Sequence, residues 1–509
     1  MMTARDQQSQ VITLSQLLKD VCDSEFLPDV EVKGLALDSR QVEPGFIFVA
    51  LEGHFEHGLA YAEAAISRGA IAVLCDAQYD QYCQQILAKI SSRTVCVPIK
   101  HLPIKLSQLA NIFYDYPSEK LFVSGVTGTD GKTTVSHFIA QSMQSSESPA
   151  ALIGTLGNGL INQLDKSAQT TPDMLSLQRM LAQYVDAGAS SVSMEVSSHG
   201  LDQNRVNGVS FDVAILTNLS RDHLDYHGDL GNYKQAKKKL FTGDLSKALV
   251  LNADDGLGQE LYLELAGHKS IWLYGMNKDK ACKSEMYVYA TQLETHRDGM
   301  KFMLHSSQGS AEISTGLIGD FNVYNMLACF CVLLQSGLNF NLAVKRIEKL
   351  KTVPGRMEII AQPGKPVVVI DYAHTPEALS QVLKNIRKHT DGKVICVFGC
   401  GGDRDAGKRP IMAQVAEQNA DLVILTSDNP RNEDPALIID EVQQGISDQL
   451  KLIVEADRAR AIQQAINMAS ADDLVLLAGK GHEDYQIIGN KKIPFSDREQ
   501  ALKGLEAIK

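Results

Sequence analysis

A glycine-rich turn between a strand pattern and a helix pattern constrains this chain more than any other feature. Residues 121–123 are an apolar run suited to a buried strand, and beyond Lys132 apolar residues recur at helical spacing as far as Met143. The turn reads Gly-Val-Thr-Gly-Thr-Asp-Gly-Lys-Thr-Thr over residues 125–134. In such a loop the backbone N–H groups and the helix N-terminus face an anion, the lysine reaches the β- and γ-phosphates, and the next hydroxyl can bind Mg²⁺. The segment therefore predicts a nucleotide-binding loop.

The loop departs from the common phosphate-binding pattern at one position. That pattern has a glycine five residues before Gly131, where this chain has Val126, and the glycine stands one residue earlier at Gly125. A glycine turn that merely precedes Lys-Thr is the alternative, but the flanking strand and helix favour nucleotide binding. The residues expected at the phosphates are Gly128, Thr129, Asp130, Gly131, Lys132, Thr133 and Thr134.

Length, composition and charge exclude several other classes of protein. With 509 residues the chain is expected to form about two to four domains, and its 44% hydrophobic and 22% charged residues are typical of a soluble globular protein. The net charge of −12 argues against a general nucleic-acid or anionic-membrane surface, and no apolar run is long enough to span a bilayer. The first residues lack a signal-peptide core, and the nine cysteines show no CxxC spacing. We expect a cytoplasmic monomer with reduced thiols that binds neither nucleic acid nor membrane.

The region up to about residue 101 carries its own α/β pattern. Strand patterns at residues 47–51 and 70–74 flank a helix pattern at 61–68. Polar segments at residues 37–40 and 53–58 lie beside apolar runs. Because surface turns alone account for such loops, the residues themselves leave a ligand-binding role open.

Two candidate metal ligands follow strand patterns in the central region, which extends to about residue 350. Glu195 ends the run 192–195, and His223 lies in the polar loop after the run 213–217. In an open α/β sheet, ligands gather at the carboxyl ends of the strands. A single glutamate after a strand is usually solvated, but a carboxylate and an imidazole beside a phosphate site suit a nucleotide's Mg²⁺. We therefore expect both side chains to bind the metal ion.

Lys237 occupies an unusual position in a helix pattern over residues 233–241. At about 100° per residue, Tyr233, Ala236, Lys237, Leu240 and Phe241 share one apolar face, and the other lysines nearby point away from it. The ammonium either snorkels to water, which the residues alone favour, or is desolvated so that the neutral amine is favoured. A neutral amine can react with CO₂ to give a carbamate, which is a carboxylate able to ligate Mg²⁺.

From about residue 351 the chain alternates strand, polar loop and helix. Apolar runs at residues 367–370, 394–398, 422–426 and 474–478 each lead into a loop that carries charged side chains. This pattern predicts a second doubly wound α/β domain whose loops cluster at the carboxyl ends of its strands. The residue preferences of ordinary turns account for any one of these loops. Four charged loops that each follow a strand favour a site for a zwitterionic, amino-acid-like ligand.

Six motifs in one order along the chain resemble those of the Mur ligases. They are Gly-Thr-Asp-Gly-Lys-Thr-Thr at 128–134, Met-Glu-Val-Ser-Ser-His-Gly at 194–200, Asn-Leu-Ser-Arg-Asp-His at 218–223, Gly-Arg-Met-Glu at 355–358, Asp-Tyr-Ala-His-Thr-Pro at 371–376 and Gly-Lys-Gly-His-Glu at 479–483. Asp130 stands where the family commonly has Asn. The chain is most similar to the branch that adds the third residue of the peptidoglycan peptide.

The resemblance implies an α/β fold of three domains. Residues 1–101 would form a small N-terminal α/β domain that binds the UDP end of a substrate. Residues 102–350 would form a central P-loop ATPase-like α/β domain. Residues 351–509 would form a C-terminal Rossmann-like α/β domain that binds the incoming amino acid.

The resemblance also assigns residues to each ligand. The Mg²⁺ ligands would be Thr133, Glu195, His223 and a carbamate on Lys237. The catalytic residues would be Lys132, Glu195, His223, Lys237 and His374. ATP would be held by the phosphate loop together with Asn322, Asn325, Arg356 and Asp371. The UDP end would be held by Leu37, Ser39, His54, Phe55 and Glu56. The muramoyl dipeptide would be held by Thr170, Thr171, Ser197, Gln203 and Arg205, with Gln169 where the family usually has Asn.

The implied amino-acid site distinguishes two possible substrates. Its residues would be Arg404, Asp428, Asn429, Pro430, Arg431, Gly479 and Glu483. The run from Asp428 to Arg431 resembles ligases that take meso-2,6-diaminopimelate, whereas lysine-adding relatives carry other residues there. Diaminopimelate has a distal carboxylate, which arginine can pair with two parallel hydrogen bonds, and Glu483 would meet the distal ammonium.

Two functions of different classes follow. The first is ATP-driven addition of diaminopimelate to UDP-N-acetylmuramoyl-L-alanyl-D-glutamate through an acyl phosphate, in peptidoglycan synthesis, with a lysine-adding or peptide-recycling relative as the alternative within that class. The second is a P-loop ATPase or switch whose third domain is a regulatory amino-acid sensor. The second function would release phosphate without the muramoyl dipeptide.

Overall fold

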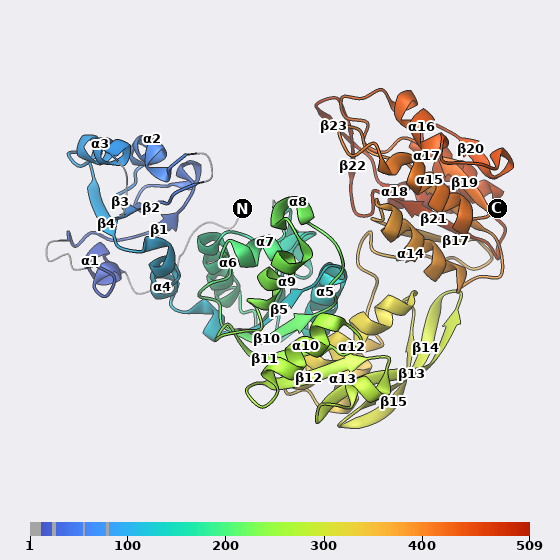
Figure 1. The fold of residues 1–509 in the computed structure, drawn as a ribbon, viewed down its shortest axis with the longest axis horizontal. Helices are drawn as coiled ribbons and strands as arrows, with labels where there is room; N and C mark the ends of the chain where they lie inside the picture. Colours follow the sequence, from blue (N-terminus) through green and yellow to red (C-terminus); the bar gives the residue numbers. More distant parts are fainter. Residues whose placement is uncertain (1–11, 23–26, 54–55, 78–80, 168, 509) are drawn as a thin grey trace. The chain divides into compact units, whose positions relative to one another are not determined.

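The computed structural model describes residues 12–22, 27–53, 56–77, 81–167 and 169–508 (Figure 1). By their contacts these residues group into two compact units. The first contains the described parts of Met1–Thr127, Gln144–Ala214 and Arg221–Lys247, and the second contains Gly128–Met143, Ile215–Ser220 and the described part of Ala248–Lys509. Within the described ranges, no helix has the length and apolar character needed to cross a membrane.

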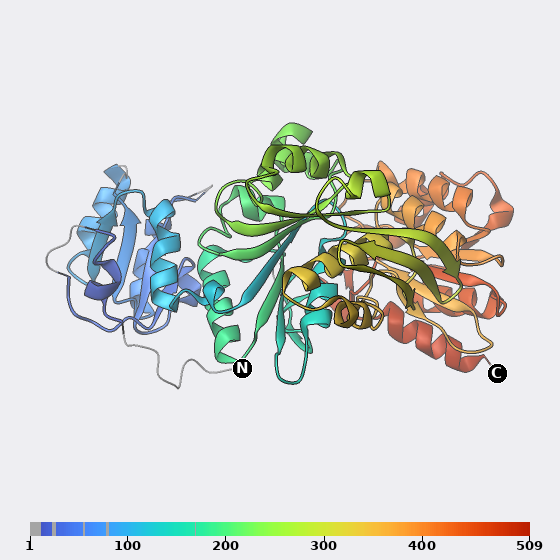
Figure 2. The ribbon, with the colours of Figure 1, turned by 90° about the horizontal axis from the view of Figure 1, so that it is seen from below.

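The first unit begins with a parallel four-stranded sheet in the order β1-β2-β3-β4. Its strands are β1 (Gly34–Ala36), β2 (Phe46–Ala50), β3 (Ala72–Asp76) and β4 (Val95–Ile99). Helices pack on both faces (Figure 2): α1 (Leu14–Leu18) and α4 (Leu102–Tyr114) on one, α2 (Ala62–Ser67) and α3 (Gln81–Ile90) on the other. Short 3-10 turns are η1 (Ser39–Gln41), η2 (Gly58–Tyr61) and η3 (Pro117–Glu119). The two strands and the helix predicted here are confirmed with shifts of a few residues at their ends.

Six further strands, in the first unit except for the last two residues of β10, lie in the order β10-β5-β9-β6-β7-β8. They are β5 (Phe122–Thr127), β6 (Ala150–Gly154), β7 (Gly157–Leu160), β8 (Gln163–Asp165), β9 (Ser191–Glu195) and β10 (Phe211–Leu216). β5, β9 and β6 are parallel, and β7 and β8 add antiparallel hairpins. Strands buried on both faces read as continuous apolar runs, which is why the sequence predicted β5 and β10. The helices of this part are α6 (Met174–Asp186), α7 (Ser198–Asp202), α8 (Leu224–His227) and α9 (Leu230–Lys238).

The second unit contains the helix of the phosphate loop, α5 (Lys132–Met143). β11 (Ser246–Asn252), β12 (Ser270–Gly275) and β13 (Met286–His296) are parallel, and β14 (Gly299–Ser306) and β15 (Gly309–Thr315) continue the sheet antiparallel. Its helices are α10 (Gly256–Leu265), α11 (Lys278–Ala281), α12 (Asp320–Gln335) and α13 (Phe340–Ile347). Most of α12 is buried, and this helix packs against α5.

The last part of the second unit is a six-stranded sheet in the order β16-β17-β21-β18-β19-β20. The strands are β16 (Glu358–Ile360), β17 (Val367–Asp371), β18 (Val394–Phe398), β19 (Leu422–Leu425), β20 (Leu452–Val454) and β21 (Leu474–Ala478), parallel except for β16. One face packs against α14 (Pro376–Arg387), α15 (Lys408–Asn419) and α16 (Pro435–Gln443), the other against α17 (Arg458–Met468) and α18 (Asp497–Ala507). η4 (Gln449–Lys451) and a hairpin of β22 (Tyr485–Ile488) and β23 (Lys491–Pro494) complete it. The predicted doubly wound domain is confirmed.

Candidate functional site

The phosphate loop follows β5 and leads into α5, as predicted. Gly128 has φ of 151° and Gly131 has φ of 83°, conformations that side chains rarely adopt. A Cβ at Gly128 would lie 1.8 Å from Thr217 Oγ1, and one at Gly131 would lie 2.9 Å from Asn325 Oδ1. Glycine at both positions therefore permits a close approach of the loop backbone to its neighbours.

Hydrogen bonds join the phosphate loop to the segment that follows β10. Thr217 Oγ1 donates to the carbonyl of Asp130 at 2.6 Å, and the Asp130 N–H donates to Asn218 Oδ1 at 2.9 Å. The N–H of Thr129 donates to the carbonyl of Asn218 at 3.0 Å. Lys132 Nζ donates to the carbonyls of Gly128 at 3.0 Å and of Thr129 at 2.7 Å, so its charge lies over the loop. The Asp130 contacts to Thr217 and Asn218 use its backbone, which makes Asp an acceptable replacement for Asn.

Two buried asparagines of α12 lie next to this loop. Asn325 Nδ2 donates to Asn322 Oδ1 at 3.0 Å, and Asn322 Nδ2 donates to the carbonyl of Ile318 at 2.8 Å. Asn325 is the side chain that would meet a Cβ at Gly131. The structure thus brings this predicted nucleotide residue to the phosphate loop, with Asn322 holding its orientation.

In the first unit, Glu195 is a buried carboxylate at the end of β9. Its Oε1 accepts from the N–H of Thr155 at 2.8 Å, and its Oε2 accepts from Thr155 Oγ1 at 3.2 Å. Glu195 is in register with Val126 on β5, the strand that leads into the phosphate loop. A Cβ at Gly154 would lie 2.3 Å from Glu195 Oε1, so glycine is needed there. Thr155 could not be predicted as a partner of Glu195, because the two residues are 40 positions apart in the chain.

The residues predicted to hold the muramoyl dipeptide come together beside Glu195. Thr171 Oγ1 donates to the Glu195 carbonyl at 3.0 Å and lies 3.1 Å from Ser197 Oγ, and Thr170 Oγ1 lies 3.1 Å from Thr155 Oγ1. Arg205 holds this segment from the other side. Its guanidinium donates to the Thr171 carbonyl, to Gln169 Oε1 and to Gln203 Oε1 at 2.6–2.9 Å. Gln169, the departure from the family pattern, therefore serves as a partner of Arg205.

An aromatic cluster lies close by in the same unit. The His199 ring is 5.0 Å from that of His223 and 4.1 Å from that of Tyr226. Burial lowers the pKa of His199, and the neighbouring histidines add to the effect. His223 is 45% exposed in its side chain, and its Nε2 lies 3.4 Å from Asp222 Oδ2. Tyr226, which sequence reasoning did not assign, accepts from Gln203 Nε2 at 3.1 Å.

Lys237 is 1% exposed, so the snorkelling alternative is wrong. Its Nζ lies 4.4 Å from the centroid of the Tyr233 ring, and the other members of the predicted face are buried as well. The helix ends at Lys238, earlier than the predicted residue 241, because the N–H groups of Leu240 and Phe241 bond three residues back instead of four. The structure therefore agrees with the alternative in which the Lys237 side chain is desolvated.

The described residues contain no group of three or more His, Cys, Asp or Glu side chains arranged to hold a metal ion. The predicted Mg²⁺ set includes only two side chains of these types, Glu195 and His223. The remaining ligands would be the hydroxyl of Thr133 and a carbamate on Lys237. Such a set suits Mg²⁺, which takes one or two carboxylates and keeps several waters.

The predicted nucleotide residues after residue 351 form a compact group. Burial raises the pKa of Asp371, whose carboxylate accepts from the N–H groups of Met357 and Ala373, both at 2.8 Å. Asp371 therefore shapes the turn that carries Arg356, whose guanidinium carbon lies 4.8 Å from the Tyr372 ring centroid. His374 Nδ1 lies 2.9 Å from the carbonyl of Tyr372.

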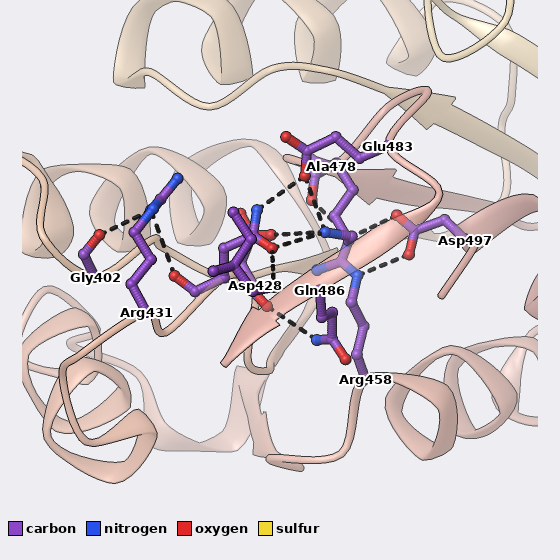
Figure 3. Close-up of polar contacts among 11 residues, drawn as sticks. Gly402, Asp428, Arg431, Arg458, Ala478, Glu483, Gln486 and Asp497 are labelled. Atoms are coloured by element: carbon purple, nitrogen blue, oxygen red, sulfur yellow. Dashed lines mark hydrogen bonds and ion pairs between the residues drawn. The ribbon is translucent and has the colours of Figure 1, made fainter. Parts of the chain in front are cut away.

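The predicted amino-acid residues also converge, at the carboxyl ends of β18, β19 and β21 (Figure 3). Arg431 Nη1 donates to the carbonyls of Gly402 at 2.8 Å and Asn429 at 3.5 Å, which ties two loops together. Gly402 in turn donates its N–H to the Asn429 carbonyl at 3.0 Å. Arg404 is exposed on the Gly402 loop, Pro430 precedes Arg431, and Gly479 lies beside Asp428.

A buried ionic network underlies this site, and sequence reasoning missed its cations. Lys480 Nζ lies 3.0 Å from Glu483 Oε2 and 3.4 Å from Asp428 Oδ1. Arg458 donates to both oxygens of Asp497, at 2.7 Å each (Figure 3). Burial raises the pKa of Asp428, although the Arg458 and Lys480 charges oppose the rise.

Comparison with known proteins identifies the family. Family models described as Mur ligase family, catalytic domain, as Mur ligase middle domain and as Mur ligase, glutamate ligase domain match residues 31–114, 126–333 and 355–481. A UDP-N-acetylmuramoyl-L-alanyl-D-glutamate--2,6-diaminopimelate ligase of Coxiella burnetii is 42% identical over 97% of this chain and 99% of its own length. The chain belongs to the Mur ligase family. The protein of the same name from Alkalilimnicola ehrlichii is 44% identical over 97% of this chain and 98% of its own length. A solved structure of an enzyme of that name is 36% identical over 98% of this chain and 99% of its own, with a TM-score of 0.73.

In this Mur ligase, three of the five predicted UDP-site residues are described. Leu37 and Ser39 follow β1, and Ser39 is buried at the start of η1. Glu56 is exposed in the loop after β2. β1 and β2 are parallel, so both loops leave the same edge of the sheet. His54 and Phe55 lie outside the described residues.

Proposed function

We propose that this Mur ligase uses ATP to add meso-2,6-diaminopimelate to UDP-N-acetylmuramoyl-L-alanyl-D-glutamate. Its relatives from Coxiella burnetii and Alkalilimnicola ehrlichii carry the name UDP-N-acetylmuramoyl-L-alanyl-D-glutamate--2,6-diaminopimelate ligase. The observation that carries the proposal is the amino-acid site after β18, β19 and β21. There Arg431 is anchored between two loops, and Glu483 is held by Asn429 and Lys480. Cations for a carboxylate and an anion for an ammonium are what a distal amino-acid centre requires.

In this proposal, the phosphate loop binds the ATP that activates the D-glutamyl carboxylate. A carboxylate is a poor electrophile, so the γ-phosphoryl group moves first to the D-glutamyl carboxylate and creates a leaving group. Lys132 stabilises charge on the phosphoryl oxygens, and Mg²⁺ adds further neutralisation when bound. The neutral amine of diaminopimelate then attacks the acyl carbon and gives up a proton as the C–O bond to phosphate breaks. One former carboxylate oxygen leaves with the phosphate.

Lys237 is proposed to carry the carbamate that completes the Mg²⁺ ligands with Thr133, Glu195 and His223. Support comes from its 1% exposure and its position against Tyr233. A carbamate forms when the neutral amine attacks CO₂ and releases a proton, so a buried amine is suited to the reaction. His374 is proposed to act near the γ-phosphate.

We further propose domain limits at residues 1–101, 102–350 and 351–509, a cytoplasmic location and a monomeric enzyme. The first proposed limit falls between β4 and α4, directly before α4 begins at Leu102, and the second falls shortly after α13 ends at Ile347. Neither limit interrupts a helix or strand core. Analytical ultracentrifugation of the purified chain tests the monomer.

The experiment that tests the reaction is isotope transfer. UDP-N-acetylmuramoyl-L-alanyl-D-glutamate labelled with ¹⁸O in the D-glutamyl carboxylate is incubated with ATP, Mg²⁺ and diaminopimelate. The proposal expects one ¹⁸O atom in each released phosphate and a tripeptide product of the corresponding mass. Phosphate that contains no ¹⁸O, with product formed, would exclude the acyl phosphate.

A further inference from the structure

Lys480 is a fully buried cation inside the proposed amino-acid site. It is 0% exposed and lies in the loop that follows β21. Its Nζ lies 3.0 Å from Glu483 Oε2, 3.3 Å from Asn429 Oδ1 and 3.4 Å from Asp428 Oδ1. All three partners are residues predicted to touch the amino acid, whereas Lys480 itself has no assigned role.

The charges around Lys480 do not cancel. Asp428 and Glu483 supply two negative charges, and Lys480 supplies one positive charge. The other buried cation, Arg458, is paired with Asp497 through two hydrogen bonds of 2.7 Å. Of the aromatic neighbours, Tyr485 has its ring centroid 5.7 Å from Lys480 Nζ, and burial raises the pKa of both Tyr485 and Tyr372, which keeps them neutral. The charges of Asp428, Glu483, Lys480, Arg458 and Asp497 therefore sum to one net negative charge.

Lys480 also fixes the direction of the Glu483 carboxylate. Glu483 Oε2 accepts from Lys480 Nζ at 3.0 Å and from Asn429 Nδ2 at 2.8 Å. Asn429 is held in turn, because its Oδ1 accepts from the N–H of Ile487 at 2.9 Å. Two donors on one oxygen determine how the carboxylate is presented to a ligand ammonium.

We propose that Lys480 is a positioning and specificity-determining residue of the amino-acid site. It orients Glu483 and sets the charge of the group at −1, so that the pocket accepts one ammonium without also taking up a proton. The inference rests on the proposed function and deepens it. Without Lys480, the buried carboxylate of Asp428 and the partly buried carboxylate of Glu483 share one site, where two like charges favour the uptake of a proton. A ligand ammonium would then have to displace that proton.

The test measures kinetic constants for all three substrates as a function of pH in the wild type and Lys480→Met. We expect the KM for diaminopimelate to rise by about 30-fold or more at pH 7, the loss typical of truncating one partner of a buried charge pair. The KM values for ATP and for the muramoyl substrate should change by less than about 3-fold, since those sites keep their contacts. In the variant, kcat/KM for diaminopimelate should increase with pH through the neutral range, a dependence that the wild type lacks.

Two companion variants separate charge from folding. Lys480→Arg keeps the positive charge, so it should raise the KM without creating the pH dependence. The double variant Lys480→Met with Asp428→Asn restores the charge of −1 and should also lose the pH dependence. The matched control is Lys492→Met: Lys492 Nζ lies 4.3 Å from the same Tyr485 ring but the residue is exposed, and all constants should stay unchanged.

The outcomes distinguish this inference from the function on which it rests. If the wild type does not use diaminopimelate, the proposed function is overturned, and Lys480 has no such ligand to select. If the wild type uses it and Lys480→Met shows the same KM and pH profile, only the role of Lys480 is overturned. If Lys480→Met impaired the use of all three substrates equally, Lys480 would have only a structural role. If kcat/KM for diaminopimelate became pH-dependent in Lys480→Arg, the charge argument would be contradicted.

Discussion

Replacement of Arg431 by alanine would remove the side chain that we expect to pair the distal carboxylate of diaminopimelate. The structure gives this arginine two tasks, because its Nη1 also donates to the Gly402 carbonyl at 2.8 Å. That hydrogen bond joins a charged guanidinium to a carbonyl, so losing it costs about 1.5–3 kcal/mol and affects every amino-acid substrate. Losing a charge-assisted pair in a partly desolvated pocket costs on the order of 2–5 kcal/mol, or roughly 30- to several-thousand-fold in kcat/KM, and affects only a substrate with a distal carboxylate.

The assay is kcat/KM for diaminopimelate and for lysine, together with ATP binding. Arg431→Ala should lower kcat/KM for diaminopimelate at least about 10-fold more than that for lysine, and leave ATP binding nearly unchanged. Arg431→Lys should restore only part of the loss, because an ammonium cannot present two parallel donors. Arg460→Ala is the matched control, since Arg460 is 76% exposed and 4.0 Å from its nearest carboxylate partner, Asp457. Equal losses for both amino acids would show that Arg431 only holds its loops together, and would refute the specificity argument.

Three further predictions concern buried ionisable side chains. Lys237→Ala should nearly abolish activity, without rescue by bicarbonate and with partial rescue by a short-chain carboxylic acid; near-normal turnover in CO₂-depleted buffer would contradict the carbamate. Asp497→Asn should leave the buried Arg458 guanidinium without its hydrogen-bonded carboxylate and lower the free energy of unfolding by about 3–5 kcal/mol in urea titrations, and a loss below about 1 kcal/mol would show that solvent reaches the pair. Burial lowers the pKa of His137 from 6.5 to about 4. Because the unfolded chain therefore takes up the proton first, the free energy of unfolding should fall by about 3 kcal/mol as the pH falls from 6.5 toward 4. A His137→Gln variant should therefore lose less stability than the wild type between pH 7 and pH 4.5, and an equal loss would contradict this.

The parts of the fold that could be predicted are those set by local pattern. Strands buried on both faces gave continuous apolar runs, and the glycines of the phosphate loop stand where a Cβ would collide with Thr217 or Asn325. The burial of Lys237 could be predicted in part, since helical spacing put it on the apolar face. Whether its ammonium reached water depended on Tyr233 and on tertiary packing, which spacing does not determine.

The residues that could not be predicted are partners supplied from a distance. Thr155 contacts Glu195 across 40 residues, and Arg458 contacts Asp497 across 39. Neither pair has a spacing that a helix or strand period would reveal. Lys480 lies within a recognised motif, yet a lysine between two glycines gives no sign that three side chains converge on it.

The central claim is that phosphate release is coupled to amide formation. The most direct measurement is the rate of phosphate release from ATP with each substrate omitted in turn. The ligase account predicts release only when the muramoyl dipeptide is present, and sustained release together with tripeptide product only when diaminopimelate is also present. Sustained phosphate release that needs neither the muramoyl dipeptide nor the amino acid would contradict it and would identify a P-loop ATPase or switch with an amino-acid-sensing domain.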